Sequence, residues 1–206
     1  MKKVLVFFCA VMLIFGMVSS AIASAIDFTS VTIDYTSNSW SLGFEFTTNK
    51  DIYVTALGFY DDNMDGLTES HEVGIYNNSG TLLVSTTVDS TSYLDGWFRY
   101  TDVTYTLLTA GSTYYIVAVT GNENYTWDPN GFTVDPSINY VTDVWAGPTS
   151  NLTFPTESGS VIAGYFGPNF KLETAAPVPE PSTMLLLDVG LIGLAGYGRK
   201  RLTEKP

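Results

Sequence analysis

Residues 61–72 carry a run of oxygen-bearing side chains that could bind a metal ion, reading Asp-Asp-Asn-Met-Asp-Gly-Leu-Thr-Glu-Ser-His-Glu. The run fits the pattern D-x-[DN]-x-[DN]-G-x5-E of calcium-binding loops, in which alternate oxygens converge on one ion and the glycine permits a sharp turn. The pattern predicts a structural Ca²⁺ held by Asp61, Asn63, Asp65, the backbone carbonyl of Leu67, and Glu72.

Two features of this segment separate it from an EF-hand. An EF-hand needs a helix on each side, whereas the flanking residues here are the β-branched and aromatic types of strands. Thr68 also stands where an aliphatic residue is usual. We therefore expect an EF-like calcium loop on a β-scaffold, and an acidic turn without metal is the alternative.

Catalytic chemistry has weaker support. His71 is the only histidine, and no nucleophile-elbow pattern accompanies it, so a Ser-His-Asp triad is not indicated. We expect His71 to bond to backbone at the edge of the loop. Glu69 and Glu72 could form the carboxylate pair of a polysaccharide hydrolase, but any acidic domain offers such pairs. The sequence therefore favours a non-enzymatic protein, with the hydrolase as the alternative.

Aromatic side chains supply a second kind of candidate site, because their faces can stack on sugar rings as well as fill cores. The tryptophans are Trp40, Trp97, Trp127 and Trp145. Trp97 follows a turn and is expected in the core. The segment 122–131 reads as a loop, so Trp127 and its neighbour Tyr125 are the predicted glycan-binding residues.

The elements that must position these residues are strands. Leu42, Phe44 and Phe46 alternate with period two, and β-branched or aromatic runs recur from residue 26 to 166. Turn sequences such as Asn-Asn-Ser-Gly at 77–80 and Asp-Pro-Asn-Gly at 128–131 separate the runs. This pattern predicts an all-β fold, an antiparallel β-sandwich or jelly roll, over residues 26–173, with a closed barrel as the alternative.

The charge of this domain limits its partners. Eighteen acidic residues lie between Asp27 and Glu173, against only Lys50, Arg99 and Lys171 as basic residues. Such a surface repels nucleic acid and anionic headgroups, so we expect no nucleic-acid partner. The one cysteine, Cys9, precedes the domain, so no disulfide stabilises it.

The first 25 residues have the organisation of a secretory signal peptide. Lys2 and Lys3 precede an almost wholly apolar stretch at 4–18, which predicts a signal helix. Two small-x-small cleavage sites follow, Ala21-Ile22-Ala23 and Ala23-Ser24-Ala25. An uncleaved membrane anchor is the alternative.

The last 33 residues form a tail of three parts. A Pro/Ala linker at 174–183 contains Val178-Pro179-Glu180-Pro181-Ser182, an apolar stretch at 184–198 predicts a single transmembrane helix, and residues 199–206 begin with Arg199-Lys200-Arg201. The stretch is short for a span and contains Asp188, features that suit a temporary anchor.

This tail resembles the PEP-CTERM sorting signal of Gram-negative bacteria. The resemblance implies an exosortase-type membrane protease as partner, transient anchoring in the inner membrane, and a final place at the cell surface or in the extracellular matrix. It also implies bacteria that make extracellular polysaccharide, so an association with that polysaccharide or with biofilm matrix is expected. Such tails are sometimes called ice-binding, but no flat Thr-x-Thr ladder supports that function here.

The domain itself resembles an uncharacterised β-sandwich family often attached to such tails. The resemblance lies in Gly58-Phe59-Tyr60, Asp65-Gly66-Leu67, residues 71–76, Gly96-Trp97-Phe98-Arg99-Tyr100, residues 108–114 and Gly167-Pro168-Asn169-Phe170. These are mainly turn and core residues, so the resemblance supports the fold and implies no activity.

Overall fold

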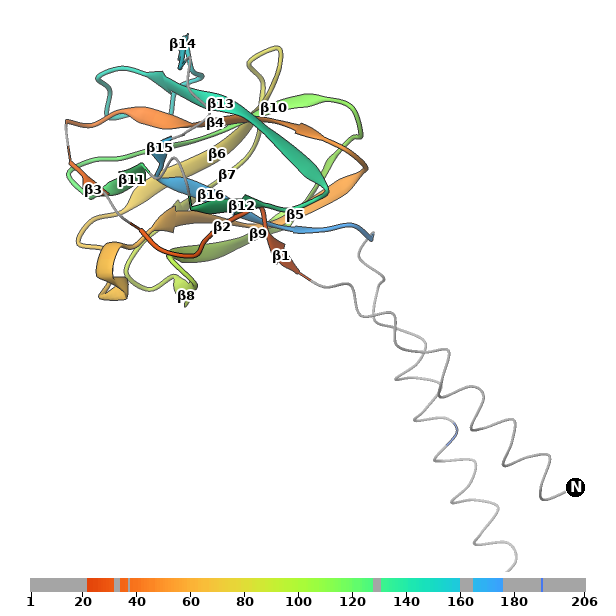
Figure 1. Ribbon diagram of the computed structural model, residues 1–206, viewed down its shortest axis with the longest axis horizontal. Coiled ribbons are helices and arrows are strands. Elements are labelled where there is room, and N and C mark those ends of the chain that lie inside the picture. Colours follow the sequence, from red (N-terminus) through yellow and green to blue (C-terminus); the bar gives the residue numbers. More distant parts are fainter. Residues whose placement is uncertain are drawn as a thin grey trace, which may run out of the picture. The chain divides into compact units, whose positions relative to one another are not determined.

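The computed structural model describes residues 22–31, 34–36, 38–127, 131–159, 165–175 and 190. Residues Ser20–Ala176 form one compact unit. Within it, the described residues fold as strands joined by turns, with one short 3-10 turn, η1 (Asp62–Met64), between the second and third long strands. Figure 1 shows these strands arranged in layers.

Two antiparallel sheets make up most of the domain. The five-stranded sheet has the order β1 (Ala23–Ser24), β16 (Pro168–Glu173), β5 (Ile52–Tyr60), β9 (Phe98–Leu108), β8 (Tyr93–Asp95). The six-stranded sheet has the order β14 (Glu157–Ser158), β13 (Ile138–Ala146), β4 (Ser41–Thr48), β10 (Thr113–Val119), β6 (His71–Asn77), β7 (Leu82–Val88). Both sheets join strands that are distant in sequence.

Two small sheets lie beside the larger ones. One has the order β15 (Tyr165–Phe166), β11 (Tyr125–Trp127), β3 (Asp34–Tyr35), and the other pairs β12 (Phe132–Val134) with β2 (Ile26–Phe28). All of these pairings are antiparallel.

Aromatic residues of the two large sheets meet in a common core. Phe46 on β4 lies 5.0 Å from Phe170 on β16, centroid to centroid, and both rings are buried. Phe59 on β5 likewise lies against the imidazole of His71 on β6. The central strands β5 and β16 are buried along almost their whole length, and burial of apolar surface stabilises the fold by about 25 cal/mol per Å².

The all-β, antiparallel prediction is confirmed by these sheets. The first part of the domain supplies two short strands, β2 and β3, which pair in different small sheets. The segment 122–131, predicted as a loop, contains β11. The folded domain also includes Ala23–Ala25, ahead of the predicted start at Ile26.

The predicted terminal segments fall outside the described residues. These are the signal helix before residue 22, Val178-Pro179-Glu180-Pro181-Ser182, the apolar stretch apart from Gly190, and Arg199-Lys200-Arg201. In the part of the chain that is described, no helix has the length and apolar character needed to cross a membrane.

Candidate functional site

The acidic segment 61–72 connects two strands, as its flanking residues predict. β5 ends at Tyr60 and β6 begins at His71, so no helix enters or leaves the described loop. The turn around η1 requires positive φ at Asn63 and Met64, and Gly66 has a φ of 114°. Only glycine adopts that last conformation at little energetic cost, which explains the glycine of the motif.

Asp61 is satisfied by protein groups. Its buried carboxylate accepts a bond from Nε of Arg99 at 2.7 Å through Oδ2, and from the N–H of Gly66 at 3.1 Å through Oδ1. Arg99 also donates to the carbonyl of Ser92 at 3.0 Å. This buried ion pair and the added bonds hold the first residue of the loop against β9. The guanidinium of Arg99 thereby compensates the negative charge of the Asp61 carboxylate.

Two of the other residues predicted to hold calcium also contact protein groups. Glu72, on β6, accepts a bond from the N–H of Leu152 at 3.4 Å. Leu67 packs its side chain into the main core. The described residues contain no group of three or more His, Cys, Asp or Glu side chains placed to hold a metal ion. The structure thus gives Asp61 and Glu72 protein partners in different parts of the chain, and calcium binding stays a prediction.

Two glutamates hold the acidic loop to the loop between β10 and β11. Glu123 accepts bonds from both the N–H and the hydroxyl of Thr68, and Glu69 accepts a bond from the N–H of Asn122. Asn124 adds a bond from its amide to the carboxylate of Asp62 at 2.8 Å. In these contacts acidic side chains connect the acidic loop to the loop between β10 and β11. The motif alone does not reveal this structural role.

His71 is a core residue and not a loop-edge group as predicted. Its ring is fully buried and stacks on Phe59 at 3.8 Å with an interplanar angle of 2°. Nδ1 lies 2.9 Å from the carbonyl of Val119, so the neutral ring carries its proton there, and the predicted bond to backbone is present. Nε2 has no hydrogen-bond partner among the described residues, and a proton added there would introduce a buried, unpaired charge.

Acidification is therefore expected to destabilise the domain through His71. Burial lowers the pKa of His71 below its usual value near 6.5, although the Val119 carbonyl, Glu123 and Glu69 partly oppose this shift. The unfolded chain then binds more protons than the folded one. Stability from this group is complete above about pH 6.5 and falls as the pH drops towards the folded pKa, by at most about 1.4 kcal/mol per pH unit.

Urea unfolding of the wild-type chain and of His71→Leu, measured between pH 7.5 and pH 5, checks this expectation. The variant is expected to be less stable at neutral pH and to show a shallower loss of stability on acidification. Equal slopes for the two proteins would show that other groups cause the pH dependence.

An aromatic pocket lies where the small β15–β11–β3 sheet meets β4 and β13. It has a volume of about 240 Å³ and is lined by Trp40, Leu42, Tyr125, Trp145 and Tyr165. Tyr165 makes edge contacts with Tyr125 at 5.7 Å and with Trp145 at 6.5 Å between ring centroids. Rings held edge to face in this way form a rigid, mostly apolar wall with polar tips.

Long-range pairing positions these rings. Trp145 on β13 lies opposite Leu42 on β4 in the antiparallel ladder. The backbone of Trp40 exchanges bonds with Thr120, whose hydroxyl accepts from the Trp40 N–H at 3.0 Å and whose N–H donates to the Trp40 carbonyl at 2.9 Å. The pocket therefore depends on residues that are up to 125 positions apart in the chain.

Of the two predicted glycan-binding residues, Tyr125 lines this pocket. Trp127 belongs to β11, where its backbone pairs with Tyr165, and its side chain lies outside the described structure. Trp145 was among the aromatic candidates of the sequence but was not the preferred residue, and Tyr165 was not singled out. Trp97 packs against the main core, as predicted.

Comparisons with known proteins identify both parts of the chain. Residues 28–165 match the family described as Domain of unknown function (DUF4082). The chain belongs to the DUF4082 family. In this member the folded domain extends beyond the matched segment at both ends, with β1 and the first two residues of β2 before it and β16 after it.

A second match covers the tail of this DUF4082 protein. Residues 177–201 match the PEP-CTERM protein-sorting motif, which confirms the predicted sorting signal. The motif implies processing by an exosortase and sorting to the cell surface or outside in Gram-negative bacteria. No curated protein matches the chain.

Proposed function

We propose that this sorted surface protein is a non-enzymatic carbohydrate-binding module, which uses the aromatic pocket to hold a neutral sugar of the extracellular polysaccharide. The observation that carries the proposal is the convergence of Trp145 and Tyr165 with Trp40 and Tyr125 around one small cavity. Its volume is below the roughly 300–1,000 Å³ typical of sites for drug-sized ligands, so it suits a single ring of a longer chain.

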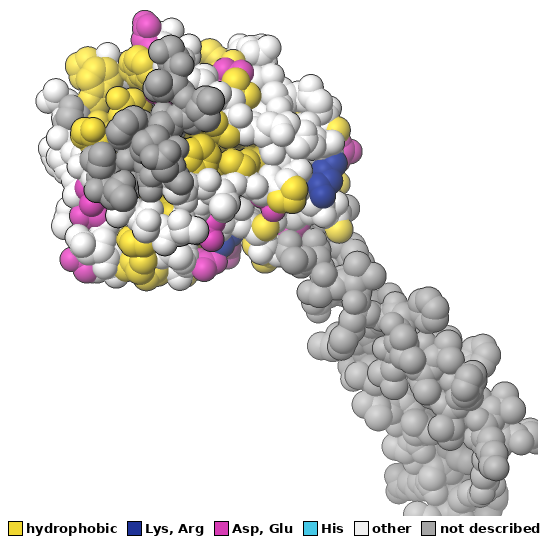
Figure 2. All heavy atoms as spheres, viewed as in Figure 1, with side chains coloured by type: hydrophobic (Ala, Val, Ile, Leu, Met, Phe, Trp, Pro, Cys, Tyr) yellow, Lys and Arg dark blue, Asp and Glu magenta, His cyan; other side chains and the backbone are white. Residues whose placement is uncertain are grey.

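The charges of the domain support a neutral ligand. Two of its three basic residues are already in ion pairs, Arg99 with Asp61 and Lys171 with Asp95. Lys50 follows the far end of β4, and a strand rises about 3.3 Å per residue, so Lys50 lies roughly 20 Å or more from Leu42. An anionic polysaccharide would thus meet repulsion without a compensating cation at the pocket. On the face shown in Figure 2, acidic side chains appear at several separate places and basic ones are few.

The lining residues also favour binding over hydrolysis. A glycoside hydrolase needs two carboxyl groups facing each other across the sugar. None of the described residues that line the pocket is Asp, Glu or His. Asp143, two residues before Trp145, is buried, and burial raises the pKa of its carboxyl. It is not part of the lining.

Trp145→Ala and Tyr165→Ala are each expected to weaken binding to neutral oligosaccharides at least about 30-fold, because truncating an aromatic anchor in a pocket removes 2 kcal/mol or more. Binding can be measured on a glycan array and then by calorimetry with the strongest neutral binder. A polyuronate serves as the anionic comparison and is expected not to bind.

Tyr105→Ala is a matched control, because Tyr105 is an exposed tyrosine on β9, outside the pocket lining. It is expected to retain wild-type affinity, and thermal melts of all three variants check that they are folded. If no neutral glycan binds the wild-type protein, or if the polyuronate binds best, the proposal is wrong.

A further inference from the structure

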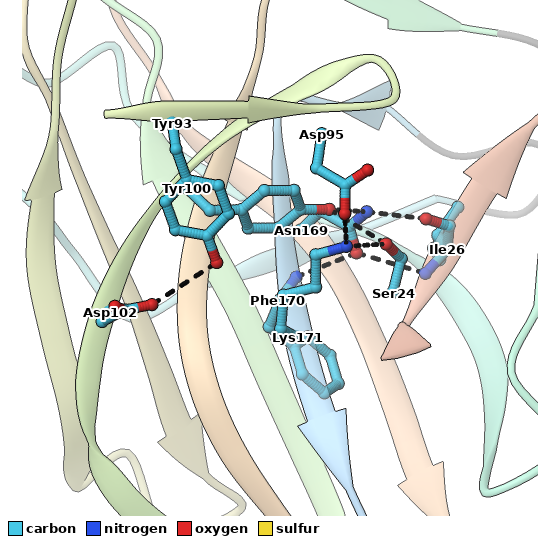
Figure 3. A network of polar contacts seen from close by, with 9 residues as sticks. All are labelled: Ser24, Ile26, Tyr93, Asp95, Tyr100, Asp102, Asn169, Phe170 and Lys171. Atoms are coloured by element: carbon cyan, nitrogen blue, oxygen red, sulfur yellow. Dashed lines mark hydrogen bonds and ion pairs between the residues drawn. The ribbon is translucent and has the colours of Figure 1, made fainter. Parts of the chain in front are cut away.

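The start of the domain is tied to its end by a network of polar contacts, shown in Figure 3. Lys171 on β16 has an almost fully buried side chain, and its ammonium donates to the hydroxyl of Ser24 at 2.8 Å. The same ammonium pairs with Asp95 and lies 4.7 Å from the centroid of the Tyr100 ring. Ser24 is thus one of the groups that satisfy a buried positive charge.

Ala25 is equally part of the fold. Its side chain is buried in the main core, its N–H donates to the carbonyl of Phe170 at 2.9 Å, and its carbonyl accepts from the N–H of Asp135 at 3.0 Å. Just before it, β1 pairs antiparallel with β16, with Ser24 opposite Lys171. Each of these backbone groups would lose a partner if Ala25 were absent, and a buried polar group left unpaired costs about 1–3 kcal/mol.

A signal peptidase could cleave at either of two small-x-small sites. The two mature chains would differ in whether they keep Ser24 and Ala25. Cleavage after Ala23 leaves Ser24 and Ala25 on the mature chain, whereas cleavage after Ala25 removes both, together with the whole of β1. The second product would leave Lys171 with one partner fewer and both the Phe170 carbonyl and the Asp135 N–H without theirs.

We infer that the signal peptide ends no later than Ala23, so that the mature surface protein keeps Ser24 and Ala25 and the site Ala23-Ser24-Ala25 is not used. The sorted protein is exposed outside the cell, and no cysteine pair stabilises its domain there. The fold therefore depends on contacts such as those made by Ser24 and Ala25. Residues 24–27, which precede the family-matched segment, therefore belong to the mature domain and not to the leader.

The test is the N-terminus of the exported protein. The full-length chain is expressed in a Gram-negative host, the exported form is purified, and its first residue is read by N-terminal sequencing and intact mass. A mature chain that begins at Ser24, or at an earlier residue, supports the inference. A chain that begins at Ala25 or later overturns it.

A variant tests the structural reason separately. Ala21→Leu places a large residue at the −3 position of the first site and leaves the second site unchanged; Ile22→Leu, at the variable position of the first site, is the control. Exported Ala21→Leu protein that begins at Ile26 is expected to melt several degrees below the control. If it melts at the same temperature, Ser24 and Ala25 do not stabilise the domain and the reason for the inference is removed.

Discussion

Replacing Asn169 with leucine is expected to lower the free energy of unfolding by about 3–5 kcal/mol, although the two side chains are similar in size. Asn169 is fully buried on β16, and its carboxamide uses both ends. Oδ1 accepts from the N–H of Ile26 at 3.2 Å and of Phe170 at 2.8 Å, while Nδ2 donates to the Ile26 carbonyl at 2.7 Å and to the Tyr100 hydroxyl at 3.0 Å.

The physical reason is that this side chain takes the place of a peptide group. The chain leaves the five-stranded sheet after β1 and enters the small sheet at β2, so Ile26 has no ladder partner on the β16 side. The amide of Asn169 satisfies both backbone groups of Ile26 at this crossing, as Figure 3 shows. Leucine would remove this partner from both backbone groups of Ile26 and leave the Tyr100 hydroxyl with only its bond to the Ser24 hydroxyl at 3.4 Å.

Urea unfolding at pH 7.5 measures this loss, and Asn151→Ala is its control. Asn151 is an exposed asparagine, so its replacement is expected to change stability by no more than about 0.5 kcal/mol. A loss below about 1 kcal/mol for Asn169→Leu would mean that water or a rearranged backbone replaces the amide, contrary to the role assigned to it.

Arg99→Met is expected to destabilise the domain by about 3–5 kcal/mol, because it leaves the buried carboxylate of Asp61 with only the Gly66 N–H as partner. A loss of this size would lower the melting temperature of a domain of this length by roughly 10 °C. Methionine keeps most of the length of the arginine stem, so the effect reports the lost charge and hydrogen bonds more than lost packing.

The double variant Asp61→Asn/Arg99→Met separates the ion pair from the loop turn. Asparagine removes the uncompensated charge but can still accept the bond from the Gly66 N–H, so the double variant is expected to be more stable than Arg99→Met alone. Additive losses would show that the two side chains are not coupled in solution.

The same melts, repeated with Ca²⁺ and with a chelator, address the predicted calcium loop. A ligand bound only by the folded state raises its stability. The predicted calcium loop requires a higher wild-type midpoint in Ca²⁺ than in chelator; equal midpoints, which the pairing of Asp61 with Arg99 would explain, contradict it. A midpoint raised by Ca²⁺ would show that the loop rearranges to bind the ion.

Much of the local structure could be predicted from residue patterns. The period-two run at 42–46 became β4, and β5 and β6, the strands on either side of the acidic loop, appear where β-branched and aromatic residues indicated them. These features depend on neighbouring residues, which alternate faces and set the turns whatever the rest of the chain does. The sorting motif is also a contiguous stretch, so it could be recognised by reading along the chain.

The candidate sites were less predictable. The spacing of the acidic loop indicated metal, but the partner of Asp61 is Arg99, 38 residues away on a strand that pairs with β5. In the same way, Tyr125 was selected as a loop residue, whereas it belongs to β11 and its ring contacts Tyr165, which lies 40 positions later. Sequence spacing reports which oxygens or rings are close in the chain, and it carries no information on which strand will lie beside them.

The sequence alone therefore determined that this is an acidic, all-β, PEP-CTERM-sorted protein, because composition, alternation and a contiguous signal are properties of the chain itself. The tertiary structure decided that the carboxylate of Asp61 is held by Arg99, that aromatic residues from four separate segments enclose one pocket, and that Ser24 and Ala25 belong to the domain. Each of these depends on antiparallel pairing between distant strands, and only the folded sheets establish that pairing.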